Sequence, residues 1–254
     1  MRIARVPRPD GPVFVEVVDD HVLLLDGHPF SGIRRTDQVA PLESVRLLAP
    51  IIPSKILCVG KNYVAHAQEF GDDVPEEPLI FSKPATAVVG PGDDVVLPRL
   101  SNNVHHEAEL AVVIGRLTRS IAVEEAMGAV LGYTCANDVT ARDLQASDNQ
   151  WTRAKGFDTF CPLGPWIETD LDPARGLSVR CSVNGESRQD GSTKDMVFDI
   201  AQIVAYCAAF TTLLPGDVIL TGTPSGVGPL NDGDSVTVSV EGLGELTNPC
   251  VAER

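Results

Sequence analysis

Residues 104–115 read VHHEAELAVVIG. Successive side chains of a β-strand point to opposite faces, so His105, Glu107 and Glu109 share one face if this stretch is a strand. Toward Gly115 both faces become apolar, which is typical of a strand that is covered on both sides inside a sheet. The sequence therefore predicts a buried strand that begins with two carboxylates on one face.

The two glutamates need a physical explanation. On a strand they lie ~6–7 Å apart and, when ionised, repel each other by roughly 2–3 kcal/mol at an effective dielectric constant near ~20. Protonation of one glutamate, a basic side chain between them or a shared cation would relieve this repulsion. Oxygen ligands at this spacing suit magnesium, manganese or calcium better than zinc. A solvated pair at a frayed strand end is the ordinary alternative, so the pair alone does not establish a metal site.

Composition excludes several classes of protein. The chain has 254 residues, 43% of them hydrophobic and 22% charged, as expected of a globular protein with one large domain and a small addition. Its net charge of −15 argues against a nucleic-acid or anionic-membrane partner, although a local cationic site could still bind a small anion. The six cysteines form no CxxC pair, so we expect reduced, buried thiols. We find neither a bilayer-spanning apolar run nor a signal-peptide core, and we predict a cytoplasmic protein.

The chain divides at a proline-containing junction, APIIPSK. Before it, alternating apolar runs with turn signals predict a small N-terminal β domain at 1–50. After it, we expect the main domain at 51–254. Strands are expected there at KILCVG, PLIFSK, HHEAELAVVIG, LSVRCSVNG, DVILTG and SVTVSV. Helices are expected at 123–133, 140–151 and 198–213, the last with Asp199 as its N-cap. Because the strands outnumber the helices and do not alternate regularly with them, the pattern predicts an α+β fold that is mostly β.

Other polar residues stand at strand ends and in loops. Asp138 lies where a short apolar strand meets a turn and a helix, a usual place for a functional carboxylate. His66 and Glu69 follow a strand and would share one face of a helical turn. Each residue alone is more often an ordinary surface or core residue, but together they suggest a site. Three further candidates are Lys83, Lys155 and Thr223.

At this point the sequence resembles the fumarylacetoacetate hydrolase family, over nearly all of 51–254. Six motifs in the same order are far more specific than any one of them. They are CVGKNYxxHxxE at 58–69, FSKP at 81–84, HHExEL at 105–110, ANDVTARDLQ at 136–145, AKGFDTFCPLGP at 154–165 and LTGTPSGVG at 220–228. The resemblance implies a mixed β-sandwich or roll with a small N-terminal β unit, assembled as a homodimer.

The resemblance also implies a site. It assigns Glu107, Glu109 and Asp138 as ligands of Mg²⁺ or Mn²⁺. It assigns a catalytic role to Lys155, as a cation at the substrate, and to His66 with Glu69, as a pair on a mobile lid segment. The acidic segment 70–78 is consistent with the edge of such a lid. The substrate-binding positions that it implies are Lys83, Arg142, Gln145 and Thr223.

The implied substrate is a short 2-oxo acid, and the implied common intermediate is a pyruvate enolate that the metal stabilises. Because the His66–Glu69 pair could activate water, we favour cleavage of a C–C bond, by hydrolysis of an acylpyruvate-like diketo acid or by decarboxylation of an oxaloacetate-like acid. The alternative is isomerisation of a hydroxymuconate or heptadiene dioate in aromatic catabolism. A catalytically silent binding domain and an assembly module are the other classes, and a missing ligand or pair residue would favour the former.

Overall fold

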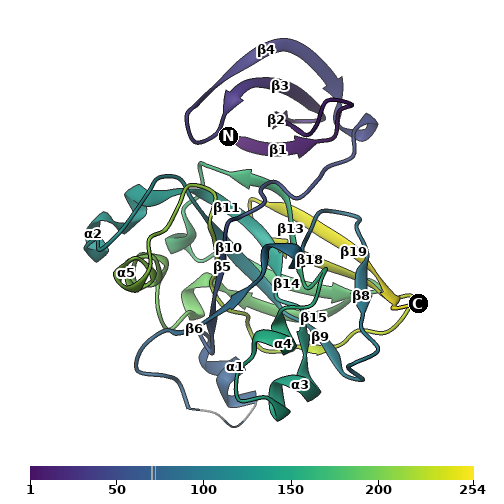
Figure 1. The fold of residues 1–254 in the computed structure, drawn as a ribbon, viewed down its shortest axis with the longest axis vertical. Coiled ribbons are helices and arrows are strands. Elements are labelled where there is room, and N and C mark those ends of the chain that lie inside the picture. The colour runs from purple at the N-terminus through teal and green to yellow at the C-terminus, as the bar shows by residue number, and fades with distance from the viewer. Residues whose placement is uncertain (70, 72) are drawn as a thin grey trace.

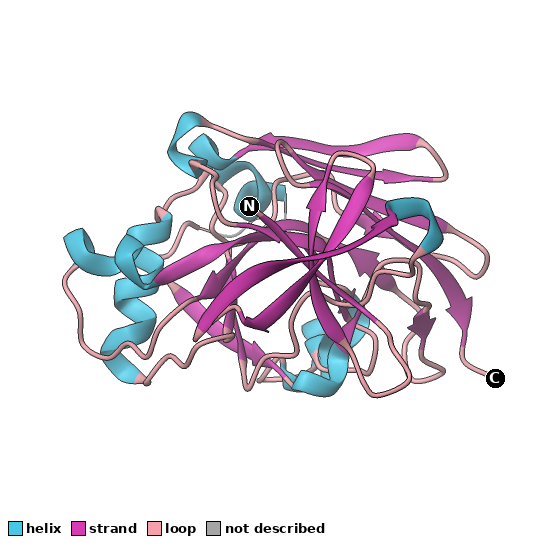
Figure 2. Ribbon diagram, turned by 90° about the horizontal axis from the view of Figure 1, so that it is seen from above, coloured by secondary structure: helices cyan, strands magenta, loops and turns pink. Residues whose placement is uncertain are grey.

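The structure is a computed structural model that describes residues 1–69, 71 and 73–254. Residues 70 and 72, which fall in the expected lid edge at 70–78, lie outside the described residues. The N-terminal strands form a small layer beside a larger body of strands, with short helices around that body (Figures 1 and 2).

A mixed sheet connects the two parts of the chain. Its order is β4 (Gly32–Pro41), β3 (His21–His28), β2 (Val13–Val18), β1 (Arg2–Val6), β13 (Cys161–Glu168), β11 (Val130–Asn137), β10 (Ala108–Ile114), β16 (Val218–Leu220), β5 (Ile56–Gly60) and β6 (Leu79–Lys83), with β7 (Val88–Val89) beside β13. The pairing of β1 with β13 is antiparallel and brings Ile3 opposite Ile167. The N-terminal unit therefore extends the central sheet.

Two smaller sheets complete the β structure. One has the order β15 (Glu186–Ser192), β14 (Ser178–Val183), β18 (Ser235–Val240), β19 (Gly244–Ala252) and β8 (Val95–Leu97). The other has the order β12 (Thr140–Ala141), β9 (Val104–His106) and β17 (Gly228–Pro229). Val179 and Val238 of the first sheet share an apolar cluster with Leu110 and Val112 of β10, so this sheet packs against the central one.

Strand β10 is buried on both faces, as the sequence predicts. Leu110 and Val112 belong to the cluster with β14 and β18, whereas Ala111 and Val113 belong to a second cluster with β5, β13 and β16. The expected continuous strand 105–115 is interrupted, because β9 ends at His106 and β10 begins at Ala108. The interruption falls on Glu107.

The helices are short. They are α1 (Val64–Glu69), α2 (Val123–Ala126), α3 (Arg142–Ser147), α4 (Thr152–Lys155) and α5 (Ile200–Phe210), with single 3₁₀ turns at Leu42–Ser44, Ala85–Ala87, Met127–Ala129, Pro173–Arg175 and Thr193–Asp195. Helix α5 begins as predicted, with the Asp199 side chain accepting from the Gln202 main-chain N–H at 2.8 Å. Helix α5 lies beside α2 at one side of the molecule (Figure 1).

Two helix predictions were partly wrong. The helix expected at 123–133 ends at Ala129, and β11 follows, because Val130 to Asn137 pairs with β10. A Cβ at Gly132 would lie 2.4 Å from the Glu168 carbonyl oxygen, so this glycine permits the close approach of β11 to β13. The helix expected at 140–151 is confined to α3, since 140–141 pairs with β9 instead.

The observed fold confirms the α+β, mostly β, prediction. All six cysteines are buried and free, as expected: Cys58, Cys135, Cys161, Cys181, Cys207 and Cys250. Among the described residues, no helix has both the length and the apolar character needed to cross a membrane.

Candidate functional site

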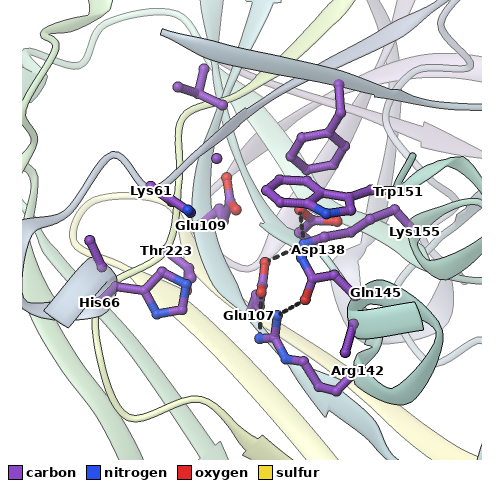
Figure 3. Close-up of a pocket in the computed structure, with 15 residues that line it drawn as sticks. Lys61, His66, Glu107, Glu109, Asp138, Arg142, Gln145, Trp151, Lys155 and Thr223 are labelled. Carbon is purple, nitrogen blue, oxygen red and sulfur yellow. Dashed lines mark hydrogen bonds and ion pairs between the residues drawn. The ribbon is translucent and has the colours of Figure 1, made fainter. Parts of the chain in front are cut away.

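A pocket of about 310 Å³ lies where several strand ends meet. Strands β5 and β16 are parallel and end at the same edge of the sheet, where antiparallel β10 begins and β11 ends. The side chains around the pocket come from these ends and from α1, α3 and α4 (Figure 3). Among the lining residues are Lys61, His66, Glu107, Glu109, Asp138, Arg142, Gln145, Trp151, Lys155 and Thr223.

Strand register brings the first two carboxylates together. Ala108 pairs with Asn137, so Glu107 and Asp138 are neighbours just beyond the paired ends of β10 and β11. The Asp138 main-chain N–H donates to the Glu107 carbonyl at 2.9 Å. The Asn137 side-chain carbonyl accepts from the Glu107 main-chain N–H, also at 2.9 Å. The interruption at Glu107 is therefore a fixed structure that places both carboxylates at one side of the pocket.

The third carboxylate is held by the segment that follows β16. Glu109 accepts a hydrogen bond from the Gly222 main-chain N–H at 2.6 Å. Gly222 has φ +101°, and a Cβ there would lie 2.7 Å from Cβ of Asn62, so this position requires glycine. Glu107, Glu109 and Asp138 each offer an oxygen within 4.8 Å of the others. The predicted convergence of the three carboxylates is present.

Three basic side chains bind this cluster. Lys155 donates to Glu107 at 2.7 Å and to Asp138 at 2.8 Å, and its side chain is 3% exposed. Arg142 donates to the second oxygen of Glu107 at 2.5 Å. Lys83 donates to Asp138 at 2.5 Å and to the Val139 carbonyl at 3.0 Å. Because these bonds are charge-assisted and buried, they fix the two carboxylates firmly.

This arrangement refines the expected role of Lys83. Its side chain is fully buried behind Asp138 and does not line the pocket. It therefore holds Asp138 in place rather than facing the pocket as a substrate-binding residue. The sequence offers no signal of this pairing, because it joins positions 55 residues apart in the chain.

The charges act unequally on the two glutamates. Burial raises the pKa of the Glu107 carboxyl, but the charges of Lys155 and Arg142 outweigh burial and hold that pKa well below its usual range. The pKa of Glu109 lies well above its usual value, because burial and the neighbouring charges of Asp138 and Glu107 disfavour its anion. Glu109 is thus the carboxylate that gains most from an added positive charge.

The residues fit a divalent cation. All three ligand atoms are carboxylate oxygens, the donors that Mg²⁺ and Mn²⁺ prefer. Ligands on opposite sides of such an ion lie ~4–5 Å apart, which the spacing of 4.8 Å or less allows. Glu107, Glu109 and Asp138 would hold the ion.

His66 and Glu69 lie on α1. His66 lines the pocket across from Glu107 (Figure 3), whereas Glu69 is not among the lining residues. The His66 Nδ1 atom and a Glu69 carboxylate oxygen are 3.2 Å apart, as their spacing predicts for one helical face. Glu69 also accepts from the Gly226 main-chain N–H at 3.1 Å. At the other end of α1, the Asn62 side chain donates to the Thr221 carbonyl at 2.7 Å. Both ends of α1 are therefore tied to the segment after β16.

The remaining predicted site residues also reach the pocket. Gln145 accepts from Arg142 at 2.8 Å, so the two side chains form one polar group at the α3 side. Thr223 donates to the Ala108 carbonyl at 2.8 Å and accepts from Gln189 at 2.7 Å. Gln189 is fully buried but comes from β15, a largely exposed strand, and nothing in its local sequence indicates this role.

The sequence assigns no role to two further pocket residues, of which one lies inside a quoted motif and the other outside all six. Lys61 follows β5 within CVGKNY, and Trp151 precedes α4. A Cβ at Gly60 would come within 2.9 Å of the Trp151 ring, and Trp151 meets Phe81 edge to face with ring centroids 5.3 Å apart. The Lys155 ammonium lies 4.9 Å from the centre of the Phe81 ring, so these rings form an apolar surface beside the charged cluster.

Comparisons with known proteins agree with this geometry. A family model described as fumarylacetoacetate (FAA) hydrolase C-terminal matches residues 55–251, and one described as Rv2993c-like, N-terminal, matches residues 1–50. Protein Rv2993c of Mycobacterium tuberculosis is 50% identical over 99% of this chain and 98% of its own. Oxaloacetate tautomerase FAHD2A, mitochondrial, of Homo sapiens is 48% identical over 84% of this chain and 72% of its own.

Solved structures extend the likeness to three dimensions. A 5-carboxymethyl-2-hydroxymuconate delta-isomerase from Mycobacterium smegmatis is 50% identical, with a TM-score of 0.92 and full coverage of both chains. A maleylpyruvate hydrolase from Sphingobium sp. SYK-6, in complex with manganese(II) ion and pyruvate, is 35% identical, with a TM-score of 0.82 and full coverage of both chains. With the family model spanning most of the sequence, these matches show that the chain belongs to the fumarylacetoacetate hydrolase family.

Proposed function

We propose that this protein is a divalent-metal-dependent enzyme that moves a proton at C3 of a short 2-oxo acid, and so interconverts keto and enol forms or isomers of its substrate. The observation that carries the proposal is that three buried carboxylates, able to share a cation, face His66 across one pocket, and that the His66 imidazole is paired with Glu69. The relatives named as tautomerase and isomerase, at 48% and 50% identity, support proton transfer as the reaction.

Each polar side chain has a part in this reaction. A bound Mg²⁺ or Mn²⁺ would supply positive charge to the substrate oxygen that becomes anionic when C3 loses its proton. His66 takes that proton and returns it, and Glu69 orients the imidazole and stabilises its charged form. Lys155 keeps Glu107 and Asp138 in place and adds a cation beside the developing anion. Arg142, Gln145 and Thr223 line the volume where the substrate's oxygens would bind.

Cleavage of a C–C bond is the second candidate, and it is the reaction that the sequence favours. The specific observation behind it is the same His66–Glu69 pair, which can deprotonate a water as well as a carbon acid. The likeness to a maleylpyruvate hydrolase supports it. Hydrolysis would require a carbonyl at C4, whereas decarboxylation of an oxaloacetate-like acid would require no attacking water.

A turnover panel tests these alternatives. It contains oxaloacetate, acetylpyruvate, a fumarylacetoacetate-like diketone and a hydroxymuconate, each with Mg²⁺, with Mn²⁺ and with a chelator. We expect chelator-sensitive loss of the enol absorbance of oxaloacetate or the muconate, without release of pyruvate or carbon dioxide. Metal-dependent release of pyruvate would favour cleavage, and turnover that resists the chelator would contradict the metal proposal.

We also propose that the chain forms a homodimer, as the family resemblance implies. If the substrate is a hydroxymuconate, we propose that its isomerisation belongs to aromatic catabolism. Light scattering should give a mass twice that of one chain. Activity on the hydroxymuconate in the same panel, in excess of that on oxaloacetate, would support the second part.

A further inference from the structure

We propose that Gln189 is a positioning residue of the metal site, and that it favours Mg²⁺ over Ca²⁺ by fixing the main chain between Glu107 and Glu109. This inference rests on the proposed function and deepens it by assigning metal selectivity to a residue outside the pocket. Gln189 lies on β15, in the sheet that packs against the central one, and is not among the pocket-lining residues. It is nevertheless fully buried.

The hydrogen bonds of Gln189 fix the orientation of its amide. The Nε2 atom donates to the Thr223 hydroxyl at 2.7 Å and to the Pro224 carbonyl at 2.8 Å. The Oε1 atom accepts from the Ala108 main-chain N–H at 3.0 Å and from His106 Nδ1 at 2.9 Å. Because a main-chain carbonyl only accepts and a main-chain N–H only donates, the amide satisfies these partners in one orientation and uses its whole hydrogen-bonding capacity.

This orientation determines that of the Thr223 hydroxyl. Since the hydroxyl accepts from Gln189, its proton is available to the Ala108 carbonyl, which lies 2.8 Å away. Both main-chain polar groups of Ala108 are therefore held, the N–H by Gln189 directly and the carbonyl through Thr223. We call these bonds of Gln189 and Thr223 to Ala108 the Ala108 clamp.

Ala108 stands between two of the proposed metal ligands. Strand β9 ends just before Glu107 and β10 begins at Ala108, so the clamp holds the main chain where the strand is interrupted. On the other side, the Gly222 N–H that binds Glu109 belongs to the residue before Thr223. The clamp thus connects the segment that carries Glu107 to the segment that holds Glu109. It sets how the two carboxylates, whose oxygens lie within 4.8 Å, approach each other.

A fixed pair of ligands distinguishes between cations of different size. Mg²⁺ requires nearly regular octahedral geometry with oxygens at ~2.0–2.1 Å, whereas Ca²⁺ accepts variable geometry at ~2.3–2.6 Å. Loosening the main chain between Glu107 and Glu109 should therefore weaken Mg²⁺ binding more than Ca²⁺ binding. Groups that hold metal ligands by hydrogen bonds typically contribute about 10- to 100-fold to metal affinity.

The experiment is isothermal titration of the chelator-treated protein with Mg²⁺ and with Ca²⁺. Gln189→Met removes the amide but keeps a neutral side chain of similar length. We expect it to weaken Mg²⁺ binding about 10-fold or more and Ca²⁺ binding less than about threefold. Thr223→Val removes only the hydroxyl and should act in the same direction with a smaller effect. The double variant should lose little more than Gln189→Met, because both changes break the same clamp.

Two control variants separate selectivity from stability. Thr223→Ser keeps the hydroxyl and should keep the wild-type ratio of the two dissociation constants. Asn248→Leu removes another buried amide, which donates to the Gly90 and Asp93 carbonyls and does not line the pocket. It should lower the melting temperature, as Gln189→Met does, but leave the ratio of dissociation constants unchanged. A merely structural role for Gln189 would give the same result as Asn248→Leu.

The outcomes are distinguishable. Equal weakening of both ions by Gln189→Met, or no weakening, overturns the positioning role and leaves the proposed function intact. A changed ratio in Asn248→Leu overturns it as well, because the ratio would then report stability alone. If Gln189→Met does not fold, Thr223→Val decides the question by the same two affinities. A wild-type protein that binds neither ion, nor Mn²⁺, overturns the metal-dependent function proposed above, and this inference with it.

Discussion

The two walls of the pocket are built in different ways. The strand wall consists of Glu107, Glu109 and Asp138, whose oxygens are fixed by buried lysines, an arginine and a main-chain N–H. The helix wall consists of Lys61, which precedes the six-residue helix α1, and of His66, which lies on α1 and is paired with Glu69. A helix this short is not stable by itself, so its position depends on the contacts at its two ends.

The difference suggests that the strand wall serves metal binding and the helix wall serves proton transfer. A metal site requires ligands that stay in place when the ion leaves, and the charge-assisted bonds of the strand wall provide this. Proton transfer requires a group that can approach the substrate. His66 stands on α1, which is hydrogen-bonded to the segment after β16 through Asn62 and Glu69. Changes to the strand wall should therefore alter metal binding, and changes to the helix wall should alter turnover alone.

The largest expected effect tests the strand wall. Glu107→Gln should reduce turnover by about a thousandfold or more, ~4 kcal/mol in the activation barrier, because it removes a proposed metal ligand. It should also abolish the rise in melting temperature that Mg²⁺ causes. Without Mg²⁺ the variant should already melt lower, since Arg142 loses its charged partner and Lys155 loses one of its two.

Glu109→Gln is the matched comparison for that variant. It should abolish the Mg²⁺-dependent rise equally but lower the metal-free melting temperature less, because the Gly222 N–H can still donate to the amide oxygen. Differential scanning fluorimetry over a magnesium series measures both effects. An undiminished magnesium shift in either variant would show that the ion binds elsewhere.

The second prediction tests the helix wall. His66→Ala should reduce proton transfer by about a hundred- to ten-thousandfold, the usual contribution of a general base. Its Mg²⁺-dependent rise in melting temperature should remain. Steady-state kinetics with oxaloacetate and with acetylpyruvate measure the loss for each substrate. If hydrolysis falls far more than decarboxylation, the imidazole activates water, whereas equal losses argue against separate roles.

A smaller effect is expected from Glu69→Gln. The amide keeps a contact with the Gly226 N–H but loses the charge that stabilises protonated His66. Turnover should fall roughly tenfold, comparable to the loss of an outer hydrogen-bonding partner in a metal site. Kinetic constants for wild type, Glu69→Gln, His66→Ala and the double variant would measure the coupling. Fully additive losses would show that the two residues act independently.

The smallest effect should come from Gly222, which bonds to Glu109 of the strand wall and packs against Asn62 before α1. Gly222→Ala places a Cβ against Asn62 and strains a residue at φ +101°, at a cost of ~1–2 kcal/mol. We expect a few degrees' loss in melting temperature and a few-fold loss in both magnesium affinity and turnover. A variant that affects only one of these functions would mean that the walls are less closely connected than the contacts indicate.

The strand wall was largely predictable from the sequence. Alternation placed Glu107 and Glu109 on one side, and the family motifs added Asp138. The supporting bonds of Lys83 and Gln189 were not predictable, because they join segments whose proximity depends on sheet register. The same limit explains the helix expected at 123–133, where pairing with β10 overrides local helical preference from Val130 onward.

Strand β13 shows a different limit. Its sequence, CPLGPWIE, contains two prolines and a glycine, and it is not among the strands expected from the sequence. It nevertheless lies between β11 and β1, with a register shift where it pairs with β11. A proline removes only one hydrogen-bond donor, its own N–H. A strand whose pairing shifts register, as β13 does, can therefore contain prolines. Amino-acid composition alone does not reveal where such a shift occurs.

The pairing of β1 with β13 has a consequence for the integrity of the molecule. Without the N-terminal unit, β13 would expose unpaired main-chain groups along an apolar stretch that includes Ile167, which is now fully buried. Such an open border invites other chains to add to it. Residues 1–50 thus shield the sheet from self-association, and a shortened chain that starts at 51 should fail first by aggregating rather than by losing its chemistry.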